Sequence, residues 1–298
     1  MSSDKVIVTC ALTGVLANRA QCPHLPYTPV EIAEEAKRAY DAGASVVHIH
    51  GREDDGAQSW STEVYGAIKA EVNKRCPIVV NFSTGGFNMG VDGEDAKRAR
   101  LDYIRAVKPE VAALNMGSMN YAKYSQKRRA FVFDFVFPNP FGDIVTCLEA
   151  MREGGVKPEL ECFDAGHIHN AEPLRAMGLL HGPTQYSFIL GVLGGIAPTA
   201  DALAYMSRAI PSDSTWEIIG ISRVQWRLLA AALSLGGNIR VGLEDNFYLD
   251  AAGTQMAQGN GPLVEKAVRM ARDVGREPAT PDEARAMLSV GKAWPAAA

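Results

Sequence analysis

Residues 28–50 read TPVEIAEEAKRAYDAGASVVHIH, and this stretch holds one unit of the predicted fold. Thr28 followed by Pro29 is typical of a helix start, because a threonine side chain caps free backbone amides and proline fits the first helical turn. Gly43 is typical of a helix end. The β-branched run Ser45–His50 that follows it predicts a buried strand. One helix therefore leads directly into one strand.

The same alternation of strand and helix extends along nearly the whole chain. Eight strands are expected, at Val6–Cys10, Ser45–His50, Ile78–Phe82, Val111–Asn115, Leu160–Phe163, Tyr186–Leu190, Glu217–Ile221 and Ile239–Gly242. Helices are expected between them, at Pro29–Ala42, Glu63–Lys74, Glu94–Val107, Phe141–Glu153, Thr199–Ala209 and Val224–Leu235. Strands that alternate with helices in this way predict parallel βαβ units.

An open, doubly wound sheet and a closed barrel are both built from such units. The open sheet typically carries a G-x-G-x-x-G phosphate-binding motif after its first strand, and Thr13–Leu16 does not form one. The count of eight strands favours a closed (β/α)8 TIM barrel, and the chain length suits one such domain over residues 1–298. One more helix is expected at the C-terminal end, at Pro281–Val290, packed outside the barrel or against a partner subunit.

The composition is that of an ordinary globular protein, with 47% hydrophobic and 21% charged residues. The formal net charge of -4 argues against nucleic acid as a partner. The five cysteines show no C-x-x-C spacing, which favours reduced core residues over disulfides or a cysteine metal site. The N-terminal residues do not resemble a signal peptide, and no apolar run approaches the roughly 20 residues that span a bilayer. We therefore expect a cytoplasmic protein without a membrane partner.

Polar residues at the carboxyl ends of the predicted strands are the first candidates for an active site, because barrel enzymes carry their sites there. The second strand ends in His48-Ile49-His50. Residues two apart in a strand point to the same side, so both imidazoles project together and can bind one metal ion. A hydrogen-bonded histidine pair without a metal is the alternative that this short pattern leaves open.

The eighth strand is followed by Glu244 and Asp245, and Glu244 shares one face with Arg240. Strand eight of a closed barrel adjoins strand one, which adjoins strand two, so Glu244 is expected to reach the ion held by His48 and His50. Two imidazoles and one carboxylate leave coordination positions open, as in catalytic metal sites. Zinc is the favoured metal, and the same ligands suit iron or manganese. A solvated turn is the alternative interpretation of the two carboxylates.

Other strand ends add to the candidate site. Ser83, Thr84 and Gly86 follow strand three, where hydroxyls and glycine amides can bind an anionic substrate. Asn115 occupies the corresponding place after strand four. Glu161 lies within the fifth strand, where a carboxylate is costly to bury alone. We expect it to contact the arginine of strand eight, another site residue or the ligand.

Several segments, in the same order, resemble the β-keto acid cleavage enzymes, and the resemblance runs from about residue 5 to residue 290. The segments are TCALTG at 9–14, GASVVHIHGREDDG at 43–56, STGG at 83–86, LNMGSMN at 114–120 and RVGLEDN at 240–246. The resemblance implies a (β/α)8 barrel that assembles as a homotetramer. It also implies Zn²⁺ on two histidines and a glutamate, which match His48, His50 and Glu244.

The family converts a β-keto acid and acetyl-CoA into acetoacetate and a new acyl-CoA, and the resemblance implies this acyl transfer here. Zinc would hold the keto and carboxylate oxygens, and Asp245, oriented by Arg240, would remove a proton from the carbon between them. Ser83 and Gly86 match positions that bind the keto acid, and Glu161 matches an acidic active-site residue. A metal-dependent aldolase or hydrolase that does not use acetyl-CoA is the alternative enzyme, and a barrel that only binds or assembles is a third possibility.

Two positions depart from the family member that cleaves an amino-substituted keto acid. That enzyme carries a glutamate suited to the substrate ammonium where this chain has Leu16, and a threonine where it has Ala113. An ammonium without its carboxylate would be left unpaired, so Leu16 predicts a neutral or apolar acyl chain. A cationic substrate stays open if Phe87, Trp226 or Tyr121 supplies an aromatic face.

Overall fold

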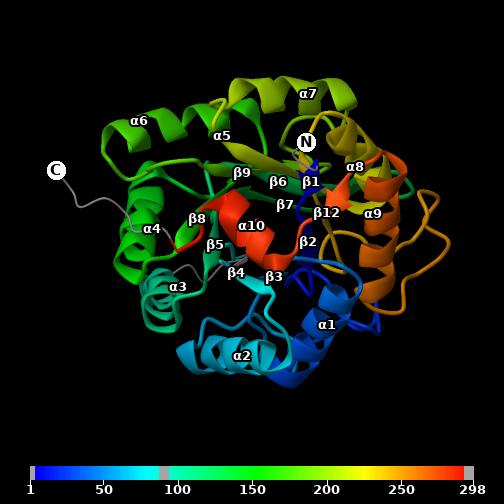
Figure 1. The fold of residues 1–298 in the computed structure, drawn as a ribbon, viewed down its shortest axis with the longest axis horizontal. Coiled ribbons are helices and arrows are strands. Elements are labelled where there is room, and N and C mark those ends of the chain that lie inside the picture. The colour runs from blue at the N-terminus through cyan, green and yellow to red at the C-terminus, as the bar shows by residue number, and fades with distance from the viewer. Residues whose placement is uncertain (1–3, 87–93, 292–298) are drawn as a thin grey trace.

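The computed structural model describes residues 4–86 and 94–291, with residues 94–98 described by their backbone alone. Eight parallel strands close into a barrel in the order β10-β11-β2-β3-β4-β5-β8-β9, and helices surround it (Figure 1). The strands are β2 (Val8–Ala11), β3 (Val46–Ile49), β4 (Val79–Ser83), β5 (Val111–Asn115), β8 (Lys157–Cys162), β9 (Gln185–Leu190), β10 (Thr215–Gly220) and β11 (Asn238–Val241). The predicted TIM barrel is confirmed, and each predicted strand overlaps an observed one.

Six predicted helices are present, with ends close to the expected residues, and three of them begin at a side-chain cap, which is a strong local signal. Thr28 and Glu31 form both hydrogen bonds of a capping box at the start of the first helix. Thr199 caps another helix by accepting a hydrogen bond from the Ala202 amide. The helices are α1 (Pro29–Asp41), α2 (Thr62–Arg75), α3 (Glu94–Val107), α4 (Phe141–Gly154), α7 (Ala200–Ala209) and α8 (Gln225–Ser234).

Some elements of the structure were not predicted. An antiparallel hairpin of β6 (Met119–Ser125) and β7 (Ala130–Phe137) follows the carboxyl end of β5. The strand–helix alternation gave no place for a hairpin between β5 and α4, although residues 130–137, AFVFDFVF, are rich in strand-forming residues. The other additions are α5 (Ala165–His169), α6 (Ala171–Ala176), η1 (Ser222–Val224), α9 (Gly261–Asp273), and β1 (Lys5–Val6) paired with β12 (Glu277–Pro278).

The last helix, α10 (Pro281–Leu288), is present where a C-terminal helix was expected, but its position corrects the prediction. It lies across the amino-terminal mouth of the barrel (Figure 1). Ala284 and Leu288 pack against residues of the barrel interior, namely Ile7, Val46, Val79 and Val111. The helix is therefore a plug for the barrel, because the apolar side chains at this end of the barrel would otherwise face water.

A layer of polar side chains lies above this apolar end, inside the barrel. Thr9 and Ser187 donate hydrogen bonds to the Glu217 carboxyl group, at 2.7 and 3.2 Å, and Asn81 and Ser187 donate to Glu159. All five side chains are buried. None of the described helices is long and apolar enough to cross a membrane.

Candidate metal centre and active site

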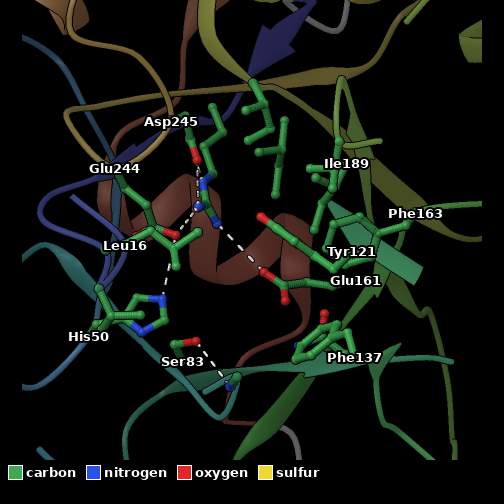
Figure 2. A pocket seen from close by; sticks show the side chains of 18 of the residues that line it. Leu16, His50, Ser83, Tyr121, Phe137, Glu161, Phe163, Ile189, Glu244 and Asp245 are labelled. Carbon is green, nitrogen blue, oxygen red and sulfur yellow. Dashed lines mark hydrogen bonds and ion pairs between the residues drawn. The ribbon is translucent and has the colours of Figure 1, made fainter. Parts of the chain in front are cut away.

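His48, at the end of β3, and His50, just beyond it, point to the same side, as their spacing predicted. Their ring centroids are 5.3 Å apart. Glu244, from the loop after β11, lies opposite them, with its Oε1 atom 3.6 Å from His48 Nε2 and 3.4 Å from His50 Nε2. Potential ligand atoms of the three residues all lie within 4.8 Å of one another. The three predicted ligands thus come together, and Figure 2 shows Glu244 facing His50.

Two glycines bring Glu244 this close. Gly242 has a φ of +142°, and a Cβ atom there would lie 2.1 Å from the Ala11 carbonyl oxygen. Gly14, in the loop after β2, has a φ of +58°, and a Cβ atom there would lie 2.6 Å from Glu244 Cγ. Only glycine combines such dihedral angles with so close an approach. The strand between β11 and β3, which is β2, therefore does not block the Glu244 side chain from reaching His48 and His50.

The trio fits a divalent cation. Both ring nitrogens of His48, Nδ1 of His50 and Oε2 of Glu244 are buried without a hydrogen-bond partner. Burial and the nearby Arg240 charge hold the pKa of His48 well below its usual range, so its imidazole is neutral, the form that binds metals. Burial alone would raise the pKa of Glu244, but the Arg240 charge outweighs it and holds this pKa well below its usual range, so the carboxylate is ionised. A metal ion would satisfy these buried groups.

Arg240 connects the trio to two further carboxyl groups. Its Nε and Nη2 atoms donate to Asp245 Oδ2 and Oδ1 at 2.9 and 3.0 Å, and Nη2 also donates to Glu244 Oε1 at 2.7 Å. Nη1 lies 3.7 Å from Glu161 Oε1. Glu161 therefore contacts the arginine of strand eight, which was one of the expected partners. The guanidinium is 2% exposed, so these charge pairs are shielded from water.

Burial also changes the protonation of the two carboxyl groups. It raises the pKa of Asp245 to about 6, although the Arg240 charge opposes the shift. Burial and the neighbouring Glu159 raise the pKa of Glu161 to about 8, again against Arg240. At neutral pH the site therefore combines an ionised Asp245 with a mostly protonated Glu161.

The predicted substrate-binding residues do not all line the cavity. Ser83 and Asn115 line it, and the side-chain oxygen of Asn115 is buried without a hydrogen-bond partner. Thr84 instead donates its hydroxyl to a backbone carbonyl of β5, at 2.5 Å. Gly86 packs against Trp60, since a Cβ atom there would lie 2.3 Å from the indole ring. Neither Thr84 nor Gly86 lines the cavity, and their roles in binding stay predictions.

The cavity has a second, apolar side that was not predicted. We call it the aromatic wall, and its residues come from the β6–β7 hairpin and from the ends of β8, β9 and β10. It consists of Tyr121, Phe137, Phe163, Ile189, Val192, Ile219 and Ile221. Figure 2 shows it across the cavity from His50, Glu244 and Leu16. The hairpin supplies two of its aromatic rings, so the wall could not be found while the hairpin was missing from the prediction.

The three aromatic residues considered for a cationic substrate have different positions. Tyr121 lines the cavity. Trp226 does not, because its indole nitrogen donates to the Tyr248 carbonyl and Lys266 Nζ lies 3.9 Å from its ring centroid. Phe87 lies outside the described residues. Tyr121 alone of these residues is therefore placed to contact a ligand in the described part of the chain.

The chain is similar to known proteins over nearly its whole length. Residues 5–290 match the family model described as beta-keto acid cleavage enzyme. A 3-keto-5-aminohexanoate cleavage enzyme of Fusobacterium nucleatum subsp. nucleatum is 38% identical over 290 residues, which are 97% of this chain and 99% of that protein. A 3,5-dioxohexanoate:acetyl-CoA acetone transferase of Paraburkholderia graminis is 33% identical over 304 residues, covering 96% of each chain.

A solved structure shares the fold. ObcA in a binary complex with oxaloacetate has a TM-score of 0.72 to this chain at 22% identity. The match covers 90% of this chain and 68% of the ObcA chain. At this identity the likeness concerns the fold alone.

Proposed function

Because the chain belongs to the beta-keto acid cleavage enzyme family, we propose that it condenses a β-keto acid with acetyl-CoA and releases acetoacetate and a new acyl-CoA. The observation that carries this proposal is the buried trio of His48, His50 and Glu244 beside the paired Arg240 and Asp245. The trio can hold the ion that such a reaction needs, and the pair supplies a base fixed in one orientation.

A divalent ion on the trio, with zinc as the first choice, would supply the Lewis acid that makes C2 of the β-keto acid acidic. Asp245 is the proposed base that removes the C2 proton, and Arg240 holds it by two hydrogen bonds. The C2 carbanion attacks the acetyl thioester, and coenzyme A leaves. Its thiolate then attacks the original keto carbon and breaks the bond to C2, and the carbanion left at C2 of acetoacetate takes back the proton from Asp245. Glu161 is proposed to hold the guanidinium from its other end, and Ser83 and Asn115 to contact the keto acid.

The chemistry around the cavity supports a β-keto acid with a neutral acyl chain. Leu16 lines the cavity next to Gly14, which packs on Glu244, so the acyl chain meets an apolar side chain close to the metal ligands. Among the described residues, no lysine lines the cavity, and the arginine that does, Arg240, is already paired with carboxylates. An acyl chain with an anionic end would therefore lose its solvation without gaining a free cationic partner.

We further propose that the enzyme is a homotetramer. Support comes from apolar side chains exposed on and beside the hairpin: Phe131 is 58%, Val136 63% and Phe141 51% exposed. Large apolar side chains left exposed on and beside one hairpin commonly mark protein–protein interfaces. Light scattering coupled to size-exclusion chromatography tests this assembly.

A panel of β-keto acids, assayed with acetyl-CoA that carries ¹³C in its acetyl group, tests the reaction. The label should appear at C3 and C4 of acetoacetate, because C2 of the keto acid attacks the acetyl carbonyl. A new acyl-CoA should form in equal amount. Cleavage of a keto acid that does not depend on acetyl-CoA would contradict acyl transfer and support a metal-dependent aldolase or hydrolase.

Replacement of a metal ligand tests the proposed centre. Glu244→Ala should remove the bound metal, measured by elemental analysis, and acetoacetate formation together, because it takes away the one carboxylate of the trio. Glu53→Ala, which replaces an exposed glutamate shortly after His50, is the matched control and should keep both. An active Glu244→Ala enzyme without metal would contradict the site.

A further inference from the structure

Tyr121, on β6, places a phenol in the cavity that the reaction scheme above does not use. Its ring stacks on Phe135 at 5.4 Å between centroids and meets the edges of Phe137 and Phe163 at 5.9 and 6.2 Å. These contacts fix the ring from several sides. Figure 2 shows its hydroxyl directed to the middle of the cavity, beside Glu161.

The cavity must hold two reagents, and its two sides differ in chemistry. The side of His50, Glu244 and Ser83 holds the β-keto acid in the proposed reaction. The acetyl thioester would then lie on the opposite side of the cavity, against the aromatic wall; Figure 2 shows Tyr121, Phe137, Phe163 and Ile189 of this wall across from His50 and Glu244. This assignment rests on the proposed function, because it presupposes a second reagent with a carbonyl group.

The aromatic wall offers very few hydrogen-bond donors to a thioester carbonyl. Of its described residues, Tyr121 has the only polar side-chain atom, since the others are phenylalanine, valine and isoleucine. Burial raises the pKa of the Tyr121 phenol, and the nearby Glu244 and Asp245 carboxylates raise it further. The phenol is therefore protonated at neutral pH and can donate a hydrogen bond.

We propose that the Tyr121 hydroxyl donates a hydrogen bond to the carbonyl oxygen of the acetyl thioester and stabilises the oxyanion formed there. When the C2 carbanion bonds to the carbonyl carbon, the π electron pair of the C=O bond moves onto this oxygen. The pair returns when the C–S bond breaks and coenzyme A leaves as thiolate. The phenolic proton stays on Tyr121 throughout. Tyr121 thus acts in the condensation and not in the removal of the C2 proton.

Two assays separate these steps. Exchange of the C2 hydrogen of a β-keto acid in D₂O, without acetyl-CoA, reports proton removal alone. Formation of acetoacetate with acetyl-CoA reports the whole reaction. Tyr121→Phe keeps the stacked ring, so exchange should stay within about twofold of wild type. Turnover should fall about 100- to 1,000-fold, the usual loss when one oxyanion donor is removed.

Three controls make the result decisive. Tyr124→Phe removes a hydroxyl from the same strand at a 41% exposed position and should change neither assay. Asp245→Asn should lose exchange and turnover together, because it removes the proposed base. Thermal unfolding should show Tyr121→Phe to be folded like wild type.

Two outcomes for Tyr121→Phe would overturn the inference. Turnover within threefold of wild type would show that the hydroxyl is not needed. Equal losses in exchange and turnover would place its role before the condensation. The wild-type enzyme distinguishes a failure of the proposed function: if it exchanges the C2 hydrogen but makes no acetoacetate with any acid of the panel, the acyl transfer is wrong, and the inference is overturned with it.

Discussion

Leu16 extends over the cavity from the loop after β2, and 49% of its surface is exposed. It lies on the same side of the cavity as His50 and Glu244 (Figure 2). The family resemblance implies a glutamate in this place in the member that cleaves an amino-substituted keto acid. We propose that this difference changes the side chain facing the acyl group and leaves His48, His50, Glu244 and Asp245 to the shared chemistry. Substrate choice and shared chemistry would then depend on different residues.

Leu16→Glu should change the ranking of substrates. A carboxylate at this position can pair with an ammonium on the acyl chain and would repel an anionic one. We expect kcat/KM for an amino-substituted β-keto acid to rise about tenfold relative to a neutral acid of the same length. Leu16→Gln, which is polar but uncharged, is the control for size and polarity. An unchanged ranking in competition assays would contradict the role of Leu16 in selecting substrates.

Residue spacing predicted the trio of His48, His50 and Glu244, because successive side chains of a strand point to opposite sides and residues two apart point to the same side. His48 and His50 are two apart, and the closed barrel brings the loop after β11 to them across β2. The same reasoning could not show that the Thr84 hydroxyl donates to the backbone of β5. Thr84 lies just past the end of β4, where side chains no longer alternate between the two sides of a strand. Nor could residue spacing place Tyr121, whose position depends on an unpredicted hairpin.

The loop after β2, which carries Gly14 and Leu16, is held in part by the buried side chain of Arg52. Arg52 donates hydrogen bonds to the carbonyl oxygens of Gly14 at 2.7 Å and Ala17 at 2.8 Å. It also donates to Thr13 at 3.2 Å and lies over the Tyr27 ring at 4.7 Å. Because Gly14 packs on Glu244, Arg52 supports a metal ligand through the loop.

Arg52→Lys should weaken both the fold and the metal site. Lysine keeps the charge but lacks the planar fork, so some of these buried carbonyl oxygens lose their donor. We expect the free energy of unfolding to fall by about 2–3 kcal/mol. Metal affinity, measured by competition with a chelator, should fall about 10-fold or more, as for other residues that support a ligand.

Arg19→Lys is the matched control. The Arg19 guanidinium also lies over the Tyr27 ring, 4.2 Å from its centroid, but the Arg19 side chain is exposed. This control should leave metal affinity unchanged. If Arg52→Lys bound metal as tightly as wild type, the loop would not support Glu244.

Some helices and strands were predicted correctly from the sequence, and others were missed. Helices with strong caps and strands with β-branched runs were found within a few residues of their ends. The hairpin was missed because a regular alternation of strands and helices left no place for it. The helix α9 was also missed, although the same alternation calls for a helix after the eighth strand, β11. The position of α10 depends on where the apolar mouth of the barrel lies, which is a property of the closed fold and not of the helix.

At the scale of the whole molecule, the barrel interior is built in layers. Its amino-terminal end is apolar and closed by α10, and the site occupies the other end. Between them lies the polar layer with Glu159 and Glu217, joined by shared hydrogen bonds from Ser187. Two carboxyl groups so close in a dry interior cannot both be ionised cheaply, so the layer is expected to hold a proton.

Glu217→Gln tests that proton through stability. Burial raises the pKa of Glu217 well above its usual range and the neighbouring Glu159 raises it further, against the opposing effects of Thr9 and Arg240. Glu217 in the folded protein therefore binds a proton more tightly than in the unfolded chain. Its contribution to the free energy of unfolding is complete below pH 4.5 and declines above it by up to about 1.4 kcal/mol per pH unit, until the folded-state pKa is reached.

Glutamine mimics the protonated acid at every pH, so urea unfolding of Glu217→Gln between pH 5 and pH 8 should show a smaller loss of stability than wild type. Glu153→Gln, at an exposed ion pair with Arg105, is the control and should keep the wild-type slope. Equal slopes for Glu217→Gln and wild type would mean that Glu217 is ionised inside the barrel. The polar layer would then have to be stabilised by its hydrogen bonds and by Arg240 alone.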